Sequence, residues 1–525
     1  GASLGFDALI IAISQVYEGR GKRWYTSTLE LRLASLETCR ACRRVPTIHV
    51  RVDANTPTSL WSPRAVQTRA HSRSSKARAM RTRAHTRSST ARAMQTRAHA
   101  RSSKARISSR VPVGQALGLT WALPTKILLQ GVAVELWIKL EFLQLMEHLS
   151  PSDLASVAWP QGLKRLALET GFEVATSAES WPASLESVTL GNTFNQEIAG
   201  AVWAESLLQI TFGARFDQPV FSAVWPASLQ QIAFGRDFNQ DITGVRWPTS
   251  LRIAAFGDVF NQPIADVLWP VSLQRLSFGT RFNQPIAGIL WPASLQHLSF
   301  GRDFNQPVTE AVWPASLRQI SFSARFNQPL AGIMWPPPLK DISFGRDFNQ
   351  PVAAIVWPAS LQRLSFGSFF NQPIDGARWP CSLQQLSFGY WFNQPIAAVA
   401  WPASLQQLSF GYCFNQPIGA VFWPASLQQL LFWSTFNQPI HEVKWPASLK
   451  DLTFGRDFNH PITAVAWPAS LQRLSFGSRF NQPIAGIMWP SSLQQLSFAS
   501  WFNQPVAAIV WPASLQQLSF GSTCA

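Results

Sequence analysis

A tryptophan recurs every 22 residues from Trp159 to Trp511, without one insertion or deletion, so that a single unit is present in seventeen copies. A typical copy is WPASLQRLSFGSFFNQPIDGAR, residues 357–378. A fixed short period of this kind means that identical supersecondary units stack on each other along one axis. We therefore expect residues 159–525 to form a solenoid, in which one thin core extends along the whole array.

Each unit contains one segment with the pattern of a short strand. The stretch SLQRLSFG alternates apolar and polar residues near its end and is bounded by Trp-Pro and by Gly. Strands spaced 22 residues apart must be parallel, so we expect a leucine-rich-repeat-like, right-handed coil with one parallel β-sheet of about 17 short strands and little helix. Leu361, Leu364 and Phe366 should face the core, and Phe370 and Ile374 should fill it from the return segment.

Two repeated residue types are expected to build the solenoid rather than to bind a ligand. The asparagine of each FNQP segment should hydrogen-bond backbone groups that the bend leaves unpaired, and stacked copies would form an asparagine ladder. The tryptophan should fill a wide corner between adjacent coils, and the proline after it should stiffen the entry to the strand. Representative positions are Asn283, Asn305, Asn327, Asn349, Asn371, Trp291, Trp313 and Trp357.

The positive charge of the chain belongs mainly to its N-terminal part. Of the net charge of +16, residues 1–158 hold 24 Lys and Arg against 9 Asp and Glu, whereas residues 159–525 hold 20 against 19. Residues 64–106 form basic low-complexity repeats of 14 residues, with 11 Arg, 2 Lys and no acid. Burial cannot offset the ordering entropy of such a segment, so we expect it to be disordered. Residues 1–63 show no period and stay unassigned.

Residues 107–158 are expected to supply a linker and a helical N-terminal cap. The segment VELWIKLEFLQLMEHL, residues 134–149, places apolar residues at mostly helical spacing, with charged residues among them: Leu136, Ile138, Phe142, Leu145, Met146 and Leu149. It directly precedes the degenerate first repeat. A helix against an atypical first unit is typical of the capped end of a solenoid.

The repeat resembles a known family. The pattern L-x-x-L-x-[LF]-G-x-x-F-N-x-P-[IL] is similar to the FNIP repeat, a variant of the leucine-rich repeats, over about 367 of 525 residues. The chain departs from it by having Trp where that family more often has Leu before Pro, and at Ala204, Asp217 and Asp241. The resemblance implies a solenoid used for protein recognition, and the family has no catalytic residues to transfer.

The candidate binding residues are those that break the repetition. Aromatic side chains fall in four consecutive coils at one edge of the expected sheet: Phe369, Tyr390, Trp391, Tyr412 and Trp433. A contiguous exposed aromatic patch is typical of a recognition surface, although packing of the edge on its own loops is the alternative. Two positions after the strand glycine, where Phe369 and Trp391 stand in their repeats, other repeats have charged residues. Arg281, Asp303, Arg325 and Asp347 would form an alternating charge ladder there, which we interpret mainly as solvated ion pairs.

Two further functions stay open beside the non-catalytic protein scaffold. Residues 142–159 are similar to the second half of an F-box, with Leu145, Met146, Leu149, Asp153 and Leu154 at matching positions, but without the leading Leu-Pro. This resemblance implies a substrate receptor of a ubiquitin ligase that binds a Skp1-type adaptor. The basic repeats of residues 64–106 would bind nucleic acid or another polyanion nonspecifically, through contacts that weaken with salt.

Other classes of function find little support. The pair Cys39 and Cys42 has metal-like spacing but no second pair, and no phosphate loop or catalytic constellation stands apart from the repeat, so we expect no enzyme, metal or cofactor. Five irregularly spaced cysteines and the lack of a signal peptide or membrane span favour a cytoplasmic or nuclear protein. The chain starts at Gly1 and stops in mid-repeat, as expected of a fragment.

Overall fold

The computed structural model shows a curved solenoid, in which the described residues form one sheet of 20 strands. The structure describes residues 51–52, 117–121, 140–145, 159, 162–168, 181–507 and 509–521. Neighbouring strands follow each other in sequence, and every pairing from β2 to β20 is parallel, whereas β1 pairs antiparallel with β2. The prediction of one parallel sheet with a strand in each of seventeen repeats is confirmed.

The strands are short and evenly spaced. Three strands precede the array: β1 (Arg51–Val52), β2 (Leu117–Trp121) and β3 (Leu140–Leu145). The array itself comprises β4 (Arg165–Leu168), β5 (Ser187–Leu190), β6 (Gln209–Thr211), β7 (Gln231–Ala233), β8 (Ile253–Ala255), β9 (Arg275–Ser277), β10 (His297–Ser299), β11 (Gln319–Ser321), β12 (Asp341–Ser343), β13 (Arg363–Ser365), β14 (Gln385–Ser387), β15 (Gln407–Ser409), β16 (Gln429–Leu431), β17 (Asp451–Thr453), β18 (Arg473–Ser475), β19 (Gln495–Phe498) and β20 (Gln517–Phe520).

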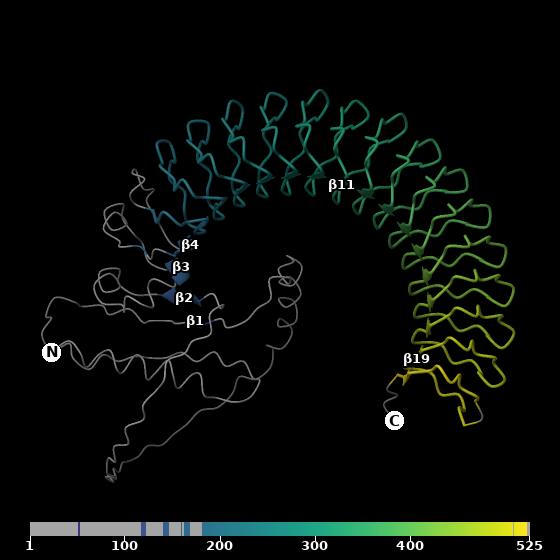
Figure 1. Ribbon diagram of the computed structural model, residues 1–525. Helices are drawn as coiled ribbons and strands as arrows, with labels where there is room; N and C mark the ends of the chain where they lie inside the picture. Colours follow the sequence, from purple (N-terminus) through teal and green to yellow (C-terminus); the bar gives the residue numbers. More distant parts are fainter. Residues whose placement is uncertain are drawn as a thin grey trace, which may run out of the picture.

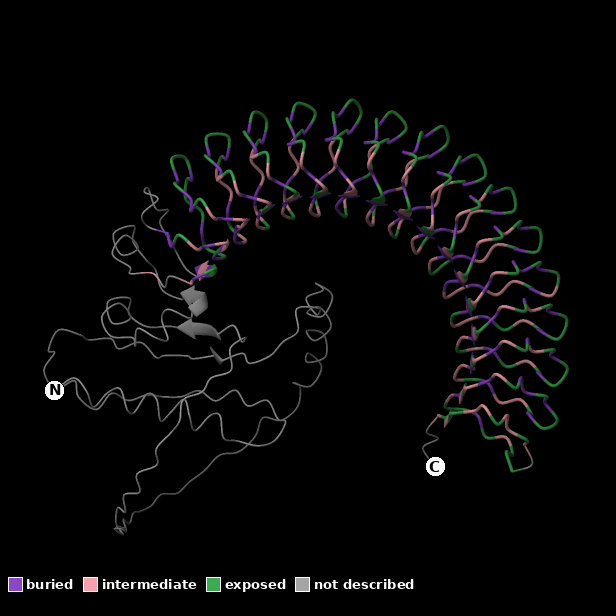
Figure 2. Ribbon diagram, in the orientation of Figure 1, coloured by how far each residue is buried: buried purple, intermediate pink, exposed green. Residues whose placement is uncertain are grey.

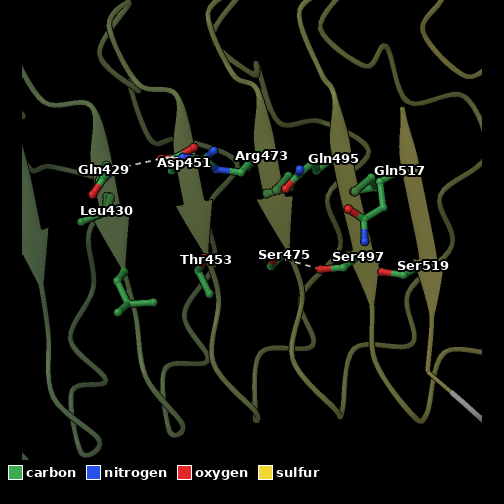
Figure 3. Close-up of a pocket in the computed structure, with 13 residues that line it drawn as sticks. Gln429, Leu430, Asp451, Thr453, Arg473, Ser475, Gln495, Ser497, Gln517 and Ser519 are labelled. Atoms are coloured by element: carbon green, nitrogen blue, oxygen red, sulfur yellow. Dashed lines mark hydrogen bonds and ion pairs between the residues drawn. The ribbon is translucent and has the colours of Figure 1, made fainter. Parts of the chain in front are cut away.

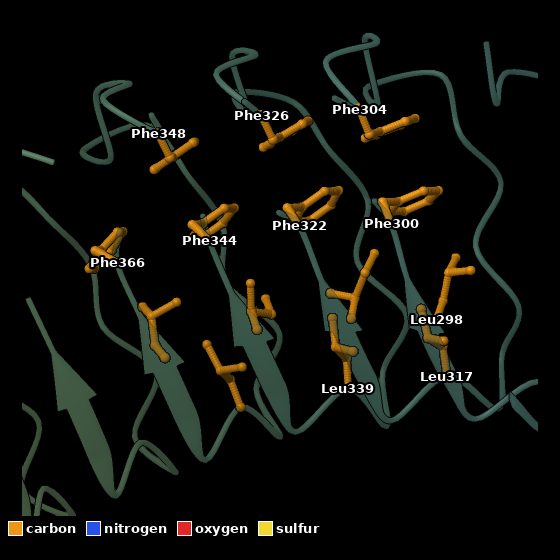
Figure 4. Close-up of a cluster of buried hydrophobic side chains, with 14 of the residues drawn as sticks. Leu298, Phe300, Phe304, Leu317, Phe322, Phe326, Leu339, Phe344, Phe348 and Phe366 are labelled. Carbon is orange, nitrogen blue, oxygen red and sulfur yellow. The ribbon is translucent and has the colours of Figure 1, made fainter. Parts of the chain in front are cut away.

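The core is a set of aromatic and leucine columns that run along the solenoid (Figure 4). In the repeat of β13, Leu361, Leu364, Phe366, Phe370 and Ile374 are all buried, as the alternation predicts. Phenylalanines stack on their equivalents in the next coil, and within one coil the two phenylalanine rings lie 4.1 Å apart, centroid to centroid. Because each coil buries its side chains against two neighbours, a single repeat has no core of its own.

The curvature of the solenoid follows from how the columns are spaced. Strands line the inner, concave side of the arc in Figure 1, and exposed loops line its outer side in Figure 2. Parallel strands lie about 4.8 Å apart. Ring centroids are 5.8 Å apart between Phe344 and Phe366 and 6.4 Å apart between Trp357 and Trp379. The coils are thus wider apart at the tryptophan corner than at the sheet, so the stack bends towards the strands.

A polar ladder runs beside the core along the FNQP bends. The backbone N–H of Asn393 donates to the side-chain oxygen of Asn371 at 2.9 Å, and Asn371 donates likewise to Asn349 at 2.9 Å. The same contact joins Asn283, Asn305 and Asn327 to their preceding coils. The next residue adds a second rung, because the Gln394 amide donates to the carbonyl of Asn371 at 3.0 Å. The sequence analysis missed this role of the glutamine.

A second ladder links the turns before the strands. The hydroxyl of Ser404 donates to the carbonyl oxygen of Leu383 in the preceding coil at 2.7 Å, and Ser382 donates to Leu361 at the same distance. Pro338 takes the place of this serine in one repeat and cannot donate. Both ladders therefore satisfy backbone groups that a tight coil leaves without an intramolecular partner.

The prediction of a helix over residues 134–149 is wrong for residues 140–145, the part of this segment that the structure describes. Leu140–Leu145 form strand β3, which pairs with β4 in parallel register, so that Leu143 lies beside Leu166 and Leu145 beside Leu168. This segment thus has the same L-x-L spacing as the first repeat, and extension of the sheet outweighs its local helical pattern. The F-box-like segment begins within this strand, so residues 140–145 are part of the sheet and not of a helical cap.

Several sequence predictions lie outside the described residues. These are the disorder of residues 64–106, Cys39 and Cys42, and most of the F-box-like segment after Leu145. Within the described part, no group of three or more His, Cys, Asp and Glu side chains is placed to hold a metal ion. The same part contains no helix with the length and apolar character that a membrane crossing requires.

Candidate functional site

The concave side of the sheet forms a long, shallow groove (Figure 3). Its floor is made by the residues that point away from the core, one on each side of the buried leucine of each strand. Over β11–β16 these include Gln319, Ser343, Gln385, Ser387, Gln407, Ser409 and Gln429, and over β16–β20 they include Asp451, Thr453, Arg473, Ser475, Gln495 and Ser519. The floor is therefore mainly amide and hydroxyl.

Charged residues interrupt this floor at two places. Arg363 pairs with Asp341 of the preceding coil, and five coils later Arg473 pairs with Asp451 in the same way. The Gln429 amide also donates to Asp451 at 3.0 Å. Between the two ion pairs, the floor formed by β14–β16 has only uncharged side chains.

The aromatic candidates lie just beyond the carboxyl ends of β13–β16. Trp391, Trp433, Phe369 and Tyr390 are 49%, 53%, 45% and 43% exposed. Tyr412 is half-buried, and its ring stacks on that of Tyr390 with centroids 4.6 Å apart and planes 5° apart. Trp391 meets Tyr390 edge to face at 5.0 Å. Aromatic side chains thus lie at the rim of the groove in four consecutive coils, with Tyr390, Trp391 and Tyr412 in contact at its centre, and we call these five residues the aromatic rim.

A close approach of the coils explains why most repeats have glycine at the start of this rim. A Cβ built on Gly389 would lie 1.8 Å from the carbonyl oxygen of Gly367 in the preceding coil. Glycine therefore lets the backbones meet, and the two residues after it turn outwards. Trp433 takes the place of this glycine in the repeat of β16.

The proposed charge ladder is only partly present. Arg325 lies 3.3 Å from Asp303 of the preceding coil, but Asp347 pairs with Arg346 of its own coil at 2.8 Å. The guanidinium of Arg346 also lies over the Phe369 ring, 5.8 Å from its centroid. These pairs are largely solvent-exposed and contribute little to stability.

The aromatic rim remains uncharged. Partial desolvation, together with Tyr412 and Cys413, raises the pKa of Tyr390 above its ordinary value. Burial raises the pKa of the Cys413 thiol in the same way. Both groups are therefore protonated at neutral pH and offer neutral hydrogen-bond donors.

Comparison with known proteins supports the repeat pattern directly. The model of the FNIP repeat matches the chain without a break from residue 260 to residue 523, in eight adjoining or overlapping segments: 260–290, 282–325, 326–369, 370–413, 392–435, 436–479, 458–500 and 480–523. The chain belongs to the FNIP repeat family. No curated protein matches it.

One solved structure, that of CroV588, places the FNIP array among the leucine-rich-repeat solenoids. CroV588, a circular leucine-rich-repeat protein, is 38% identical over 73% of this chain and 60% of its own, with a TM-score of 0.64. An internalin (inlF) from Listeria monocytogenes is 14% identical over 54% of this chain and 84% of its own, with a TM-score of 0.39. Toll of Drosophila, in its complex with Spatzle, is 10% identical over 77% and 68%, with a TM-score of 0.47.

The FNIP array also exposes a column of aliphatic residues that the sequence analysis missed. The residue before each corner tryptophan is exposed in five consecutive coils, at Leu268, Leu290, Val312, Met334 and Val356. Each follows a residue that is buried in the core. The sequence did contain a signal for this column, because a pair of apolar residues recurs before the tryptophan every 22 positions. Only the first residue of each pair is buried in the core.

Proposed function

We propose that this chain is a non-catalytic scaffold that binds another protein at the aromatic rim. Repeat solenoids of the leucine-rich kind bind through extended concave surfaces and are usually not catalysts. The observation that supports this site is the row of exposed rings over four consecutive coils, because large apolar side chains in solvent contribute nothing to the core. Aromatic residues surrounded by neutral polar ones are typical of the centre of a protein interface.

The test compares capture of a partner by the full chain and by two variants. Trp391→Ser with Tyr412→Ser removes the centre of the rim, whereas Trp501→Ser removes an exposed tryptophan outside it. The double variant should lose the captured protein and the control should retain it. Both should keep a melting temperature close to that of the unaltered protein, because none of the three side chains belongs to the buried core. Capture that survives the double substitution would refute the proposal.

The two other functions stay predictions from the sequence. A Skp1-type adaptor would bind the F-box-like segment, and a polyanion would bind residues 64–106. Both segments lie largely outside the described residues, and we build no site on them.

A further inference from the structure

The exposed aliphatic column before the corner tryptophans stands on one flank of the coils. Its side chains are between 70% and 85% exposed in five consecutive coils, and we call them the aliphatic ridge: Leu268, Leu290, Val312, Met334 and Val356. In each coil the ridge residue lies between the outer turn and the turn before the strand, as Leu290 lies between the turns at 287–288 and 293–294. Arg246 and Arg378 occupy the same column in the coils on either side. The ridge therefore extends over five coils and ends in a charge at both sides.

Small residues flank the ridge. The outer turns of these five coils consist of alanine, glycine and threonine, apart from Asp266 and Glu310. The turns before the strands begin with alanine, valine or proline. These positions are exposed on both sides of the ridge. The flank is thus an apolar strip whose charges lie only at its ends and along its outer edge, and an apolar centre with a polar rim is typical of a protein interface.

The size of this flank fits a specific interface. The tryptophan rings of neighbouring coils are 6.2 Å apart between Trp313 and Trp335, so a stack of five coils is about 30 Å long. From the outer turn to the turn before the strand, the chain runs about 20 Å, at about 3.3 Å per residue. The face therefore covers about 600 Å², which is the lower end of what each partner contributes to a standard interface and the upper end for an exposed patch on a monomer.

The repetition and the curve of the ridge indicate what covers it. Successive ridge residues are one coil apart and follow the arc of the solenoid (Figure 1). Close packing requires a partner that fills the gap after each row. A helix or strand has its own spacing, about 5.4 Å per turn or about 6.7 Å for alternate residues, and a straight element leaves a curved row after a few coils. A second copy of this chain has the same spacing and the same curve, so all five rows can pack at once.

We propose that the aliphatic ridge joins two copies of this chain, flank to flank, in a twofold-symmetric dimer. Such an interface uses the same patch on both copies and closes after two. The inference goes beyond the proposed function and does not depend on it. The aromatic rim lies beyond the carboxyl ends of the strands, whereas the ridge precedes their amino ends, so the dimer leaves two rims open. A partner with two binding segments would bind more tightly through both.

The test is sedimentation equilibrium of the full chain between about 0.1 and 100 µM, a range that covers micromolar dissociation constants. The unaltered protein should form a dimer. Leu290→Asp with Met334→Asp should raise the Kd of the dimer about a hundredfold or more, because carboxylates buried without a partner are unfavourable. The matched control is Phe422→Asp with Met488→Asp, which changes equally exposed residues of the same column outside the ridge. The control should leave Kd unchanged within about twofold.

Charge complementation shows whether the ridge meets a second ridge. Leu290→Lys with Met334→Lys should also prevent the dimer. An equal mixture of the aspartate and lysine variants should form mixed dimers with a Kd about tenfold or more below that of either variant alone, because opposite charges then face each other. Melting temperatures followed by circular dichroism should stay close to that of the unaltered protein, since Leu290 and Met334 are 83% and 85% exposed.

Several outcomes would overturn the inference. They are a monomer at about 100 µM, a dimer that persists in the aspartate variant, an equal loss in the Phe422 and Met488 control, and a mixture that associates no better than its components. A monomer whose ridge binds phosphatidylcholine vesicles would assign the ridge to a lipid surface instead. The aromatic rim is intact in all these variants, so they should still capture a partner there, and failure of the dimer leaves the proposed function untouched.

Discussion

The asparagine ladder gives the sharpest test of how the coils are held together. The side-chain oxygen of Asn371 accepts the backbone N–H of Asn393 at 2.9 Å and the Gln394 amide at 3.1 Å. Asn371→Ala removes this acceptor, but the N–H of residue 371 still donates to Asn349. The substitution therefore breaks one rung and leaves the preceding one in place.

The size of the effect follows from what is left unpaired. A backbone N–H without a partner in a part-buried site costs about 1–3 kcal/mol. Since about 1.4 kcal/mol is a factor of ten in an equilibrium constant, exchange of the Asn393 amide should become about 5 to 150 times faster. Asn371→Asp is the matched control, because Asp217 already occupies this column and accepts the N–H of Asn239 at 2.9 Å.

Hydrogen exchange read by mass spectrometry or NMR is the suitable assay, since a repeat array opens locally and one global unfolding curve averages over many coils. We expect fast exchange at Asn393 in Asn371→Ala and near-normal exchange in Asn371→Asp. An unchanged Asn393 amide in the alanine variant would refute the reasoning. So would equal exchange rates in the two variants, because the acceptor would then not be what protects the amide.

Three further predictions address the core, the pH response and the groove. Phe370→Ala removes a fully buried ring that stacks on Phe348 and Phe392. Chemical denaturation should therefore show a loss of about 3–5 kcal/mol in the free energy of unfolding. Phe369→Ala, at the exposed neighbouring position, should change it by less than about 0.5 kcal/mol. Hydrogen bonds from the hydroxyl and N–H of Thr243 lower the pKa of Asp241. The folded carboxyl therefore binds its proton less tightly than the unfolded one. These hydrogen bonds stabilise the fold above the unfolded pKa of about 3.9, and the stabilisation is lost as pH falls through the lower folded pKa. An NMR titration of that carboxyl should show this, and Thr243→Ala should return the pKa towards its ordinary value. Arg473→Gln breaks the pair between the exposed Arg473 and Asp451. Because the Gln429 amide still donates to Asp451, the free energy of unfolding should fall by no more than about 1 kcal/mol in denaturant titrations. A larger loss would show that the groove pairs hold the array together.

The repeat period was sufficient to predict the fold because each coil has the same environment as the next. Leu361, Leu364 and Phe366 could be assigned to the core from their alternation alone, since a period of two in a sheet leaves only one face for the apolar set. The local pattern misled at residues 140–145. There the spacing LEFLQL fits both a helical stripe and a strand, and only the neighbouring β4, with Leu166 and Leu168 in register, decides between them.

The ladders and the aromatic rim show what the pattern could and could not predict. The sequence shows that Asn371, Gln372 and Ser382 recur, but their partners lie in the preceding coil, and their distances depend on how closely the coils approach. Similarly, the curvature follows from ring stacking at the tryptophan corner, which is 6.4 Å for Trp357 and Trp379. These are properties of contacts between repeats, and the period alone does not give them.

The same contacts explain why residues are free to vary at only some positions of the repeat. Core, asparagine and serine positions each serve two neighbouring coils, so a change in one repeat disturbs the next. The two residues after the strand glycine, such as Tyr390 and Trp391, turn outwards from the core and are free to vary. Variation there alters the surface without changing the coil. A solenoid this regular can therefore acquire a specific site at its rim or on its groove floor without a change in the packing of its coils.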